Sequence, residues 1–414
     1  MSDIFNRLLL RGYNNLMFGG NRDLTKVFGY PETVNFDTYF DFYKRNGLCK
    51  RIVTLPCEQA WKNPPQFIVK ANPYTELDIM FKRLKMWARL EQLDRLSGIG
   101  RFGVLFMGVG AGGGKLSEPI EQGTIRQSAH LLYVKAYSEQ NVSINTYEDK
   151  NTSERYGLPE TYKIKMQAGK RGSSYKTYVV HWTRIIHVAE NCDESDVFGT
   201  PRLEAVINRM YDLEKIVGGS AEVFWKNAVQ RVAFDVDADA ELTIDAKADM
   251  AEQIEELEHN LRSYIRTQGV TPHTFGGKHG NPKSTYDIAV AFISGTTGIP
   301  RRLLEGSERG ELASSQDIKN YSSKISARQT RHINPNIFRQ MFERFEYYGI
   351  IKNQEQIEIQ WPSLYEMDEK LQAEIAKERA EALKFLSPLP VGDLITEEEA
   401  RELLGFERKS SGEF

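Results

Sequence analysis

The stretch from Gly108 to Lys115 has the residue types of a phosphate-binding loop. It is rich in glycine, contains Gly-Lys and follows an apolar run that predicts a strand. The phosphate-loop pattern needs a glycine where this chain has Val109, and a serine or threonine where it has Leu116. Without that hydroxyl a magnesium ion loses a ligand, and no predicted helix follows to present its N-terminus to a phosphate. We therefore interpret the stretch as a flexible hairpin tip rather than a nucleotide site.

The histidines and cysteines do not have the spacing of a metal site or of a nucleophile with its base. None of the seven histidines has a second one four residues away, and none of the three cysteines lies at zinc-ligand spacing. His273 and His279 flank a Gly-Gly loop that has no carboxylate or thiol partner, which favours solvated side chains over metal ligands. The odd, sparse cysteine count argues against a disulfide framework and for a reducing compartment. We therefore predict no bound metal and no cofactor.

An acidic run covers residues 252–258, in a predicted helix that carries Arg262 and Arg266 on later turns. Charges of both signs along one helix indicate a solvated or intersubunit face rather than a pair of catalytic carboxylates. The sequence also contains no Gly-x-Ser-x-Gly motif of a nucleophilic serine. It therefore predicts no catalytic residue and no enzymatic activity, and long helices without reactive clusters suit a component of an assembly.

The composition is that of a soluble protein with a real core and much exposed or intersubunit surface. Of the 414 residues 40% are hydrophobic and 27% are charged, and the length allows two or three domains or one extended subunit. The formal net charge of −3 lacks the basic excess that proteins gripping nucleic acid usually carry. No apolar run is long enough to span a bilayer and no signal peptide is recognisable, so we expect no membrane partner and a cytosolic site of synthesis.

The periodicity of apolar residues predicts an α+β fold behind a flexible N-terminal arm at 1–38. Spacings of three and four residues indicate amphipathic helices, and runs bounded by polar turns indicate strands, most of them between 130 and 190. Pro201 is well placed in the first turn of a long helix. The predicted helices cover 39–61, 74–98, 201–228, 246–267, 284–298, 314–348, 368–386 and 396–404, and the predicted strands 103–109, 131–136, 142–146, 162–166, 177–181, 185–189, 231–236, 270–275 and 357–361.

The order of these elements is similar to that of phage portal proteins. A mixed α/β region leads into a long helix, a compact β-α-β unit follows, a shorter helix returns, and a loop precedes a very long helix. The most specific string is Gly-Ile-Pro-Arg-Arg-Leu-Leu-Glu-Gly at 298–306, which resembles the portal tunnel-loop region. Other strings that resemble the family occur in the expected order and extend the resemblance over 39–406: they lie at 43–53, 181–187, 198–203, 310–315, 358–364 and 396–401.

The resemblance implies a portal-like division of the chain, in which two stem helices bracket a small β-α-β clip. Any extended crown domain at the C-terminal end would be short or absent, which leaves the contacts at that end open. The implied parts are a flexible arm at 1–38, a wing at 39–200, a stem helix at 201–229, the clip at 230–283, a second stem helix at 284–298, a tunnel loop at 299–313, a long wing helix and strand at 314–367, and a helical, short crown region at 368–414.

The resemblance also implies a structural role in a virion. Portal proteins form a homo-oligomeric ring of about twelve copies with head-to-tail interfaces. The ring would assemble in the host cytoplasm, sit at one capsid vertex and let double-stranded DNA pass during packaging and ejection. The implied partners are the terminase large subunit, the major capsid protein and neck or adaptor proteins. Two alternatives stay open: another capsid or connector protein, and a nucleic-acid-processing enzyme, which would need clustered acidic metal ligands or an intact phosphate loop.

The predicted tunnel loop carries Arg301, Arg302 and Arg309 among glycines. Glycines accept unusual backbone angles at little cost, so such a loop could follow a moving duplex while its base stays anchored. Its arginines would meet phosphates rather than base edges, so that contact would not depend on DNA sequence. An ordinary basic surface turn, or pairing of Arg301 and Arg302 with acidic residues of a neighbouring subunit, are the alternatives.

The predicted clip helix carries Glu252, Glu255 and Glu256. The unit is bracketed by stem helices and must therefore project from the body. We expect these carboxylates to dock the packaging motor, with intersubunit contacts as the alternative.

Overall fold

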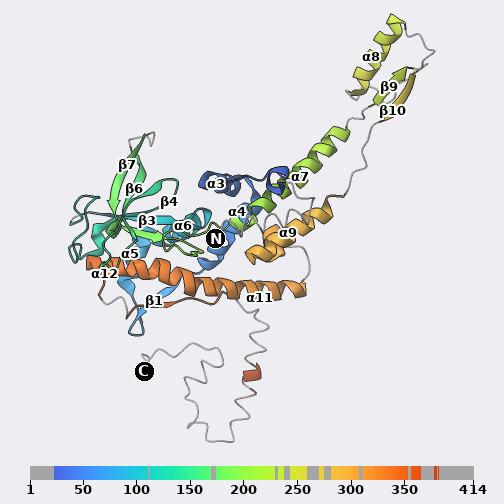
Figure 1. Cartoon of the computed structure of the whole chain (residues 1–414). Coiled ribbons are helices and arrows are strands. Elements are labelled where there is room, and N and C mark those ends of the chain that lie inside the picture. The colour runs from blue at the N-terminus through green and yellow to red at the C-terminus, as the bar shows by residue number, and fades with distance from the viewer. Residues whose placement is uncertain are drawn as a thin grey trace, which may run out of the picture. The chain divides into compact units, whose positions relative to one another are not determined.

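The computed structural model describes residues 23–110, 112–168, 174–228, 232–236, 243–258, 270–274, 281–306, 311–352, 356–364, 377–379 and 381. The chain divides into two compact units, one of residues 1–62 with 67–359 and one of residues 63–66 with 360–414. In the second unit residues 377–379 and 381, inside a predicted helix, are helical. The predicted final helix at 396–404 lies outside the described residues. The features below belong to the first unit, and the predicted α+β class is confirmed (Figure 1).

The helical start of the first unit is divided at Asn46, where the sequence predicted one continuous helix. Asn46 is extended, with φ −99° and ψ 121°, so it ends one helix, and its side chain accepts a hydrogen bond from the backbone N–H of Cys49 at 3.1 Å to begin the next. An asparagine in this role is a preferred N-cap. The elements are α2 (Leu24–Val27), inside the predicted arm, α3 (Phe36–Arg45) and α4 (Gly47–Ala60).

The next predicted helix, 74–98, is also two helices. Lys85 adopts a left-handed conformation with φ 52°, which stops the first helix and turns the chain into the second. Apolar spacing continues through the break, which is why periodicity alone did not reveal it. The elements are β1 (Gln66–Val69), β2 (Asn72–Pro73), α5 (Thr75–Leu84) and α6 (Met86–Ile99).

Two antiparallel sheets form the β region. The first has strand order β4-β3-β8 and the second β5-β6-β7. Their apolar side chains share one core that includes Phe106, Tyr162, Ile164 and Val180. The elements are β3 (Gly103–Val109), β4 (Leu131–Ser138), β5 (Val142–Tyr147), β6 (Pro159–Ala168), β7 (Ser174–His181) and β8 (Ile185–Val188), with short 3₁₀ turns at Ser128–His130 and Trp182–Arg184.

The helices and strands predicted between residues 201 and 298 appear in the expected order. The first long helix begins at Ile207, after a 3₁₀ turn at Glu204–Val206, rather than at Pro201. It packs against the helix that returns after the clip segment (Figure 1). The two clip strands pair antiparallel with each other. The elements are α7 (Ile207–Ala228), β9 (Val232–Val236), α8 (Ile244–Glu258), β10 (Val270–Thr274) and α9 (Lys283–Thr297).

The predicted tunnel segment contains a helical turn, and the long helix behind it is not uniformly α-helical. A π-helix covers Gln329–Arg339 and contains Pro335, which cannot donate a backbone hydrogen bond. Across it the buried positions Gln329, Ile333 and Ile337 recur every four residues. The elements are α10 (Arg301–Glu305), α11 (Glu311–Arg328), the π-helix, α12 (Gln340–Tyr348) and β11 (Glu358–Gln360), which adds to the sheet of β1 and β2 in the order β11-β1-β2. Among the described helices, none has the length and apolar character that crossing a bilayer requires.

Candidate functional site

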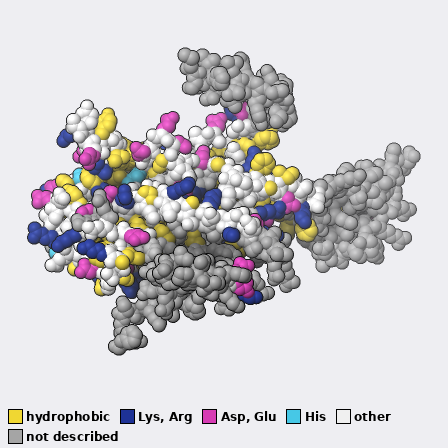
Figure 2. All heavy atoms as spheres, turned by 90° about the horizontal axis from the view of Figure 1, so that it is seen from below, with side chains coloured by type: hydrophobic (Ala, Val, Ile, Leu, Met, Phe, Trp, Pro, Cys, Tyr) yellow, Lys and Arg dark blue, Asp and Glu magenta, His cyan; other side chains and the backbone are white. Residues whose placement is uncertain are grey.

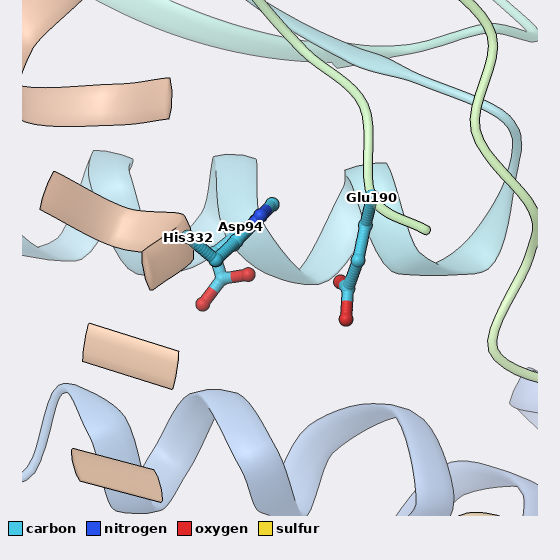
Figure 3. Close-up of side chains that lie close together, drawn as sticks. All are labelled: Asp94, Glu190 and His332. Atoms are coloured by element: carbon cyan, nitrogen blue, oxygen red, sulfur yellow. The ribbon is translucent and has the colours of Figure 1, made fainter. Parts of the chain in front are cut away.

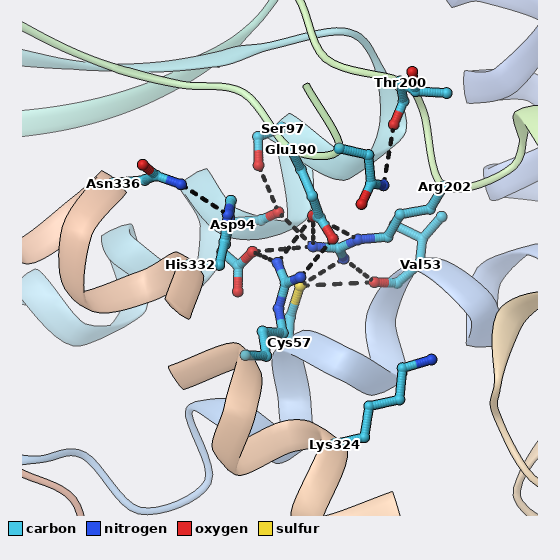
Figure 4. Close-up of polar contacts among 12 residues, drawn as sticks. Val53, Cys57, Asp94, Ser97, Glu190, Thr200, Arg202, Lys324, His332 and Asn336 are labelled. Atoms are coloured by element: carbon cyan, nitrogen blue, oxygen red, sulfur yellow. Dashed lines mark hydrogen bonds and ion pairs between the residues drawn. The ribbon is translucent and has the colours of Figure 1, made fainter. Parts of the chain in front are cut away.

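Four charged side chains from distant parts of the sequence meet where the helices and the first sheet join. Asp94 lies on the buried face of α6, Glu190 follows β8, and Arg202 precedes the turn that leads into α7 (Figure 4). Arg202 donates from Nε to Glu190 Oε2 at 2.9 Å and from Nη2 to Asp94 Oδ1 at 3.0 Å. Arg328, the last residue of α11, pairs with both carboxylates and donates from Nη2 to Glu190 Oε2 at 2.9 Å. We call these four residues the charge junction.

The charge junction is buried and formally neutral. The Asp94 side chain is 0% exposed, and two guanidinium groups balance two carboxylates. Burial alone would raise the pKa of Asp94, but Arg328 and Arg202 outweigh it and hold that pKa below its usual value. The same balance of burial against Arg202 and Arg328 lowers the pKa of Glu190. Removing one partner of such a buried ion pair lowers the free energy of unfolding by several kcal/mol, on the order of 3–5, because the remaining charge is then buried without a partner.

The junction is joined to α4 by further hydrogen bonds. Arg202 Nη1 donates to the carbonyl of Val53 at 2.7 Å and to Cys57 Sγ at 3.0 Å, and Trp61 Nε1 donates to Asp94 Oδ2 at 2.9 Å. Burial raises the pKa of the Cys57 thiol to about 12, so the sulfur is a neutral acceptor and not a nucleophile. The junction therefore fixes α4, α6, the start of α7 and the end of α11 to one another.

Asp94, Glu190 and His332 also bring three potential metal ligands together, with ligand atoms within 4.8 Å of one another (Figure 3). A divalent cation would compete there with Arg202 and Arg328, which already supply two positive charges to the two carboxylates. The donor set therefore fits an ion-pair network better than a metal centre.

Sequence reasoning did not predict the charge junction. Asp94 and Arg328 are 234 residues apart, and no local motif connects them. The available signal was Asp94 itself, a charged residue four positions after Leu90 on the apolar face of a predicted helix. A carboxylate at such a position is rarely buried without a partner.

The predicted tunnel-loop arginines lie elsewhere. Arg301, at the start of α10, pairs with Asp287 of α9 and donates from Nε to Glu305 Oε2 at 2.5 Å. Arg302 is half-buried and Arg309 lies outside the described residues. Buried Leu304 and a hydrogen bond of 2.8 Å from Arg51 Nε to the Leu303 carbonyl hold α10 against α4. The first half of the predicted loop is therefore an anchored helical turn.

The predicted motor-docking carboxylates lie together on α8. Glu252 and Glu255 are exposed, and Glu256 is half-buried. The chain from residue 229 to 231 and from 259 to 269, which flanks the clip elements, lies outside the described residues.

The Gly-rich stretch begins the connection between the paired strands β3 and β4. Buried Arg184 donates to the carbonyl of Lys115 at 3.1 Å and to that of Gly113, and Lys115 Nζ contacts Glu118 Oε1 at 2.9 Å. Carbonyl groups that face an arginine, and a lysine that faces a carboxylate, are the reverse of an anion-binding loop.

Comparison with known proteins gives the family. A family model described as "Phage portal protein" matches residues 38–385, and the chain therefore belongs to the phage portal protein family. This family is structural rather than enzymatic.

Three similar proteins illustrate the relationship. The anti-CBASS protein Acb1 of Sphingomonas paeninsulae is 24% identical over 379 residues, which is 83% of this chain and 56% of that protein. The chain thus spans little more than half the length of this relative. The neck of the empty gene transfer agent (GTA) particle, computed with C6 symmetry, matches with a TM-score of 0.53 and 14% identity over 91% of this chain and 95% of the matched one. The neck of the native GTA particle, computed with C12 symmetry, matches with a TM-score of 0.52 and 14% identity over 89% and 94%.

Proposed function

We propose that this chain forms a closed homo-oligomeric ring of about twelve copies at one vertex of a capsid. Double-stranded DNA passes through the ring during packaging and ejection, and the ring contacts the major capsid protein. The terminase large subunit docks on the clip, at 230–283, and neck or adaptor proteins bind later. Membership of the portal family supports this role, as does a fold shared with a particle neck of C12 symmetry.

The observation that carries the ring is an apolar surface on the two stem helices, which we call the stem face. Phe224 and Trp225 of α7 are 80% and 78% exposed, and Ile288 and Phe292 of α9 are 59% and 64% exposed. Val217 lies two turns before Phe224 on the same side of α7, and Ile288 and Phe292 are one turn apart. Exposed aromatic side chains on two helices that pack together are typical of a protein interface. In a ring, the stem of the next copy covers it.

A double variant tests the stem face. Phe224→Ser with Phe292→Ser removes two aromatic side chains that a single chain leaves in water, so the fold should persist while the ring dissociates. Tyr175→Ser is the matched control, because this aromatic of β7 is 68% exposed and lies outside the stem. Size-exclusion chromatography with light scattering should give rings for the control and smaller species for the double variant. Rings of unchanged mass in the double variant would refute a stem interface.

The DNA conduit involves the segment at 299–313. We expect Arg302 and Arg309 to contact DNA phosphates. Arg301 would also contact a phosphate once it gives up the ion pairs with its own carboxylate partners. On the face drawn in Figure 2, basic and acidic side chains are interspersed. We expect the surface that meets the duplex to be mixed in the same way, without a continuous basic patch. Each phosphate neutralised by a cation adds salt-dependent affinity, which would slow a sliding duplex.

Replacing all three arginines by alanine should leave the ring intact and make weak DNA binding less dependent on salt. Packaging or retention of DNA should change as well. Sedimentation of the variant distinguishes contact with DNA from contact between subunits. Dissociated subunits would mean that these arginines hold the ring together.

We expect the packaging motor to dock on α8. Reversing the charge of Glu255 and Glu256 to lysine should weaken binding of the terminase large subunit and leave the ring intact. Unchanged affinity would place the docking surface elsewhere, and lost rings would make these carboxylates intersubunit contacts.

A further inference from the structure

Two arginines lie over the ring of Trp182, in the 3₁₀ turn between β7 and β8. The guanidinium carbon of Arg155 is 3.7 Å from the ring centroid, and that of Arg344 is 4.1 Å from it. Arg155 belongs to the connection between β5 and β6, and Arg344 belongs to α12. Stacking on an aromatic ring orients a guanidinium group and leaves its N–H edge free for other partners. We call Arg155, Trp182 and Arg344 the arginine clamp.

The clamp offers N–H groups that no acceptor of the chain uses. Among the described residues, the Arg155 side chain donates only from Nη2, to the Pro159 carbonyl at 3.0 Å. Arg344 donates no hydrogen bond within the described part of the chain, and no described carboxylate lies within ion-pair distance of either arginine. Of the nitrogens without a partner in these two side chains, only Arg344 Nε is buried. Nε and Nη1 of Arg155 and both Nη atoms of Arg344 therefore reach the surface as unused donors.

The positive charges of the clamp are partly buried and close to each other. Burial, followed by the charge of Arg155, lowers the pKa of Arg344 to about 10, and burial also lowers the pKa of Arg155. Two carboxylates act on the clamp from beyond ion-pair distance. Glu343 is exposed, and Glu148 accepts a hydrogen bond from the backbone N–H of Lys150 at 3.2 Å. Two partly buried like charges are unfavourable on their own, and an anion that contacts both would stabilise them.

The chain carries a segment of opposite charge shortly after β8, at residues 193–196, which we call the acidic loop. Its three carboxylates belong to Asp193, Glu194 and Asp196, and all three residues are exposed. Within the described part of the chain none of them has a cationic partner. The acidic loop is thus complementary in charge to the arginine clamp.

The clamp and the acidic loop lie near opposite ends of β3, with which β8 pairs antiparallel. At the end of β3 that leads to Lys115, the carbonyl of Lys115 accepts a hydrogen bond from Arg184, two residues after Trp182. At the start of β3, the Gly199 N–H, just after the acidic loop, donates to the Arg101 carbonyl at 2.8 Å. The seven residues of β3 span roughly 20 Å, so the loop of one copy does not meet its own clamp.

We propose that the arginine clamp of one copy binds the acidic loop of the next copy in the ring. Head-to-tail interfaces join two different patches of the same chain, as this pair requires. The N–H edge of a guanidinium group matches a carboxylate in shape and charge. This inference rests on the ring of the proposed function, and it adds a polar contact in the β region to the apolar contact of the stem face.

Charge reversal followed by mixing of variants tests the contact in the full-length protein. The loop variant is Asp193→Lys with Glu194→Lys, and the clamp variant is Arg155→Glu with Arg344→Glu. Either variant alone places like charges in every interface, so the concentration at which half of the subunits are in rings should rise by about tenfold or more. In an equal mixture the two variants can alternate around the ring, and every interface then joins opposite charges. Light scattering should show that rings return in the mixture.

The matched control is Lys163→Glu with Lys165→Glu. Both lysines are exposed on β6, and the change of charge equals that of the clamp variant, so this control should form rings like the wild type.

Rings of the loop variant at the wild-type concentration would overturn the proposal, and this variant should keep its fold because both substituted residues are exposed. A mixture that stays dissociated, although circular dichroism shows both variants folded, would overturn it as well. Wild-type protein that forms no ring would refute the proposed function itself.

Discussion

The charge junction and the stem face differ in how their side chains are covered. In the charge junction, Asp94 is completely buried, and every charge finds its partner within the same chain. Along the stem face, Phe224 and Phe292 stand mostly in water. A buried ion pair adds stability only when its geometry is complete, whereas exposed aromatic surface gains only when another surface covers it. The difference indicates that the contacts of the charge junction are complete in a single folded chain. The stem face would be covered only when another copy binds.

The largest effect is expected from breaking the charge junction. Arg328→Met keeps much of the side-chain volume and removes the charge, so Asp94 and Glu190 lose one of their two cations. We expect the free energy of unfolding to fall by about 3–5 kcal/mol in urea titrations. Arg339→Met, at an exposed position of the π-helix, is the control and should change it by less than about 0.5 kcal/mol. A loss below about 1 kcal/mol for Arg328→Met would show that the junction does not hold the elements together.

Mild acid should weaken the body of the subunit. Burial lowers the pKa of His187 from 6.5 to about 4, and burial followed by Arg328 lowers that of His332. A histidine with a depressed pKa stabilises fully above pH 6.5, and this contribution is lost as the pH falls towards the folded-state value. Between pH 7 and pH 5 the unfolding free energy should fall, by about 2 kcal/mol from His187 and by a further amount from His332.

The carboxylates of the charge junction should not contribute in that range, since their pKa values lie below the usual ones. Urea midpoints at several pH values give the slope, and His187→Asn should flatten it. An equal slope in the variant would mean that other groups titrate.

Substituting alanine at two glycines of α9 and its end should change the free energy of unfolding in opposite directions. Gly298 ends α9 with φ +61°, which L-residues adopt only with strain, so Gly298→Ala should cost about 1 kcal/mol. Gly295 lies inside α9 with open space around it, and Gly295→Ala should add about 0.5–1 kcal/mol. Chemical denaturation of both proteins makes the comparison. Equal effects of the same sign would show that the helix does not end at Gly298.

The smallest effect on subunit stability is expected at the stem face. Phe224→Ser and Phe292→Ser should each change the unfolding free energy of the dissociated subunit by less than about 0.5 kcal/mol, since both side chains are already exposed. The measurement is urea denaturation at a concentration low enough to keep subunits apart. A loss above about 2 kcal/mol would mean that these aromatics belong to the core of one chain.

The order of elements was predictable from the sequence, and the contacts between distant elements were not. Apolar periodicity located α7, α9 and most strands, because burial of one face imposes that period. Periodicity predicted α3 and α4 as one helix, and α5 and α6 as another. It missed the breaks because they depend on single residues, Asn46 in an extended conformation and Lys85 in a left-handed one. It read the segment around Arg301 as a free loop, because pairing with Asp287 appears only when α9 and α10 are folded together. The charge junction was not predicted from the sequence, because its four residues lie far apart along the chain.

The central claim is that the stem face is completed by further copies of the same chain. Native mass spectrometry of the purified full-length protein, without DNA and over a wide range of concentration, tests it most directly. We predict one dominant closed species of about twelve subunits. Monomers at every concentration would contradict the claim.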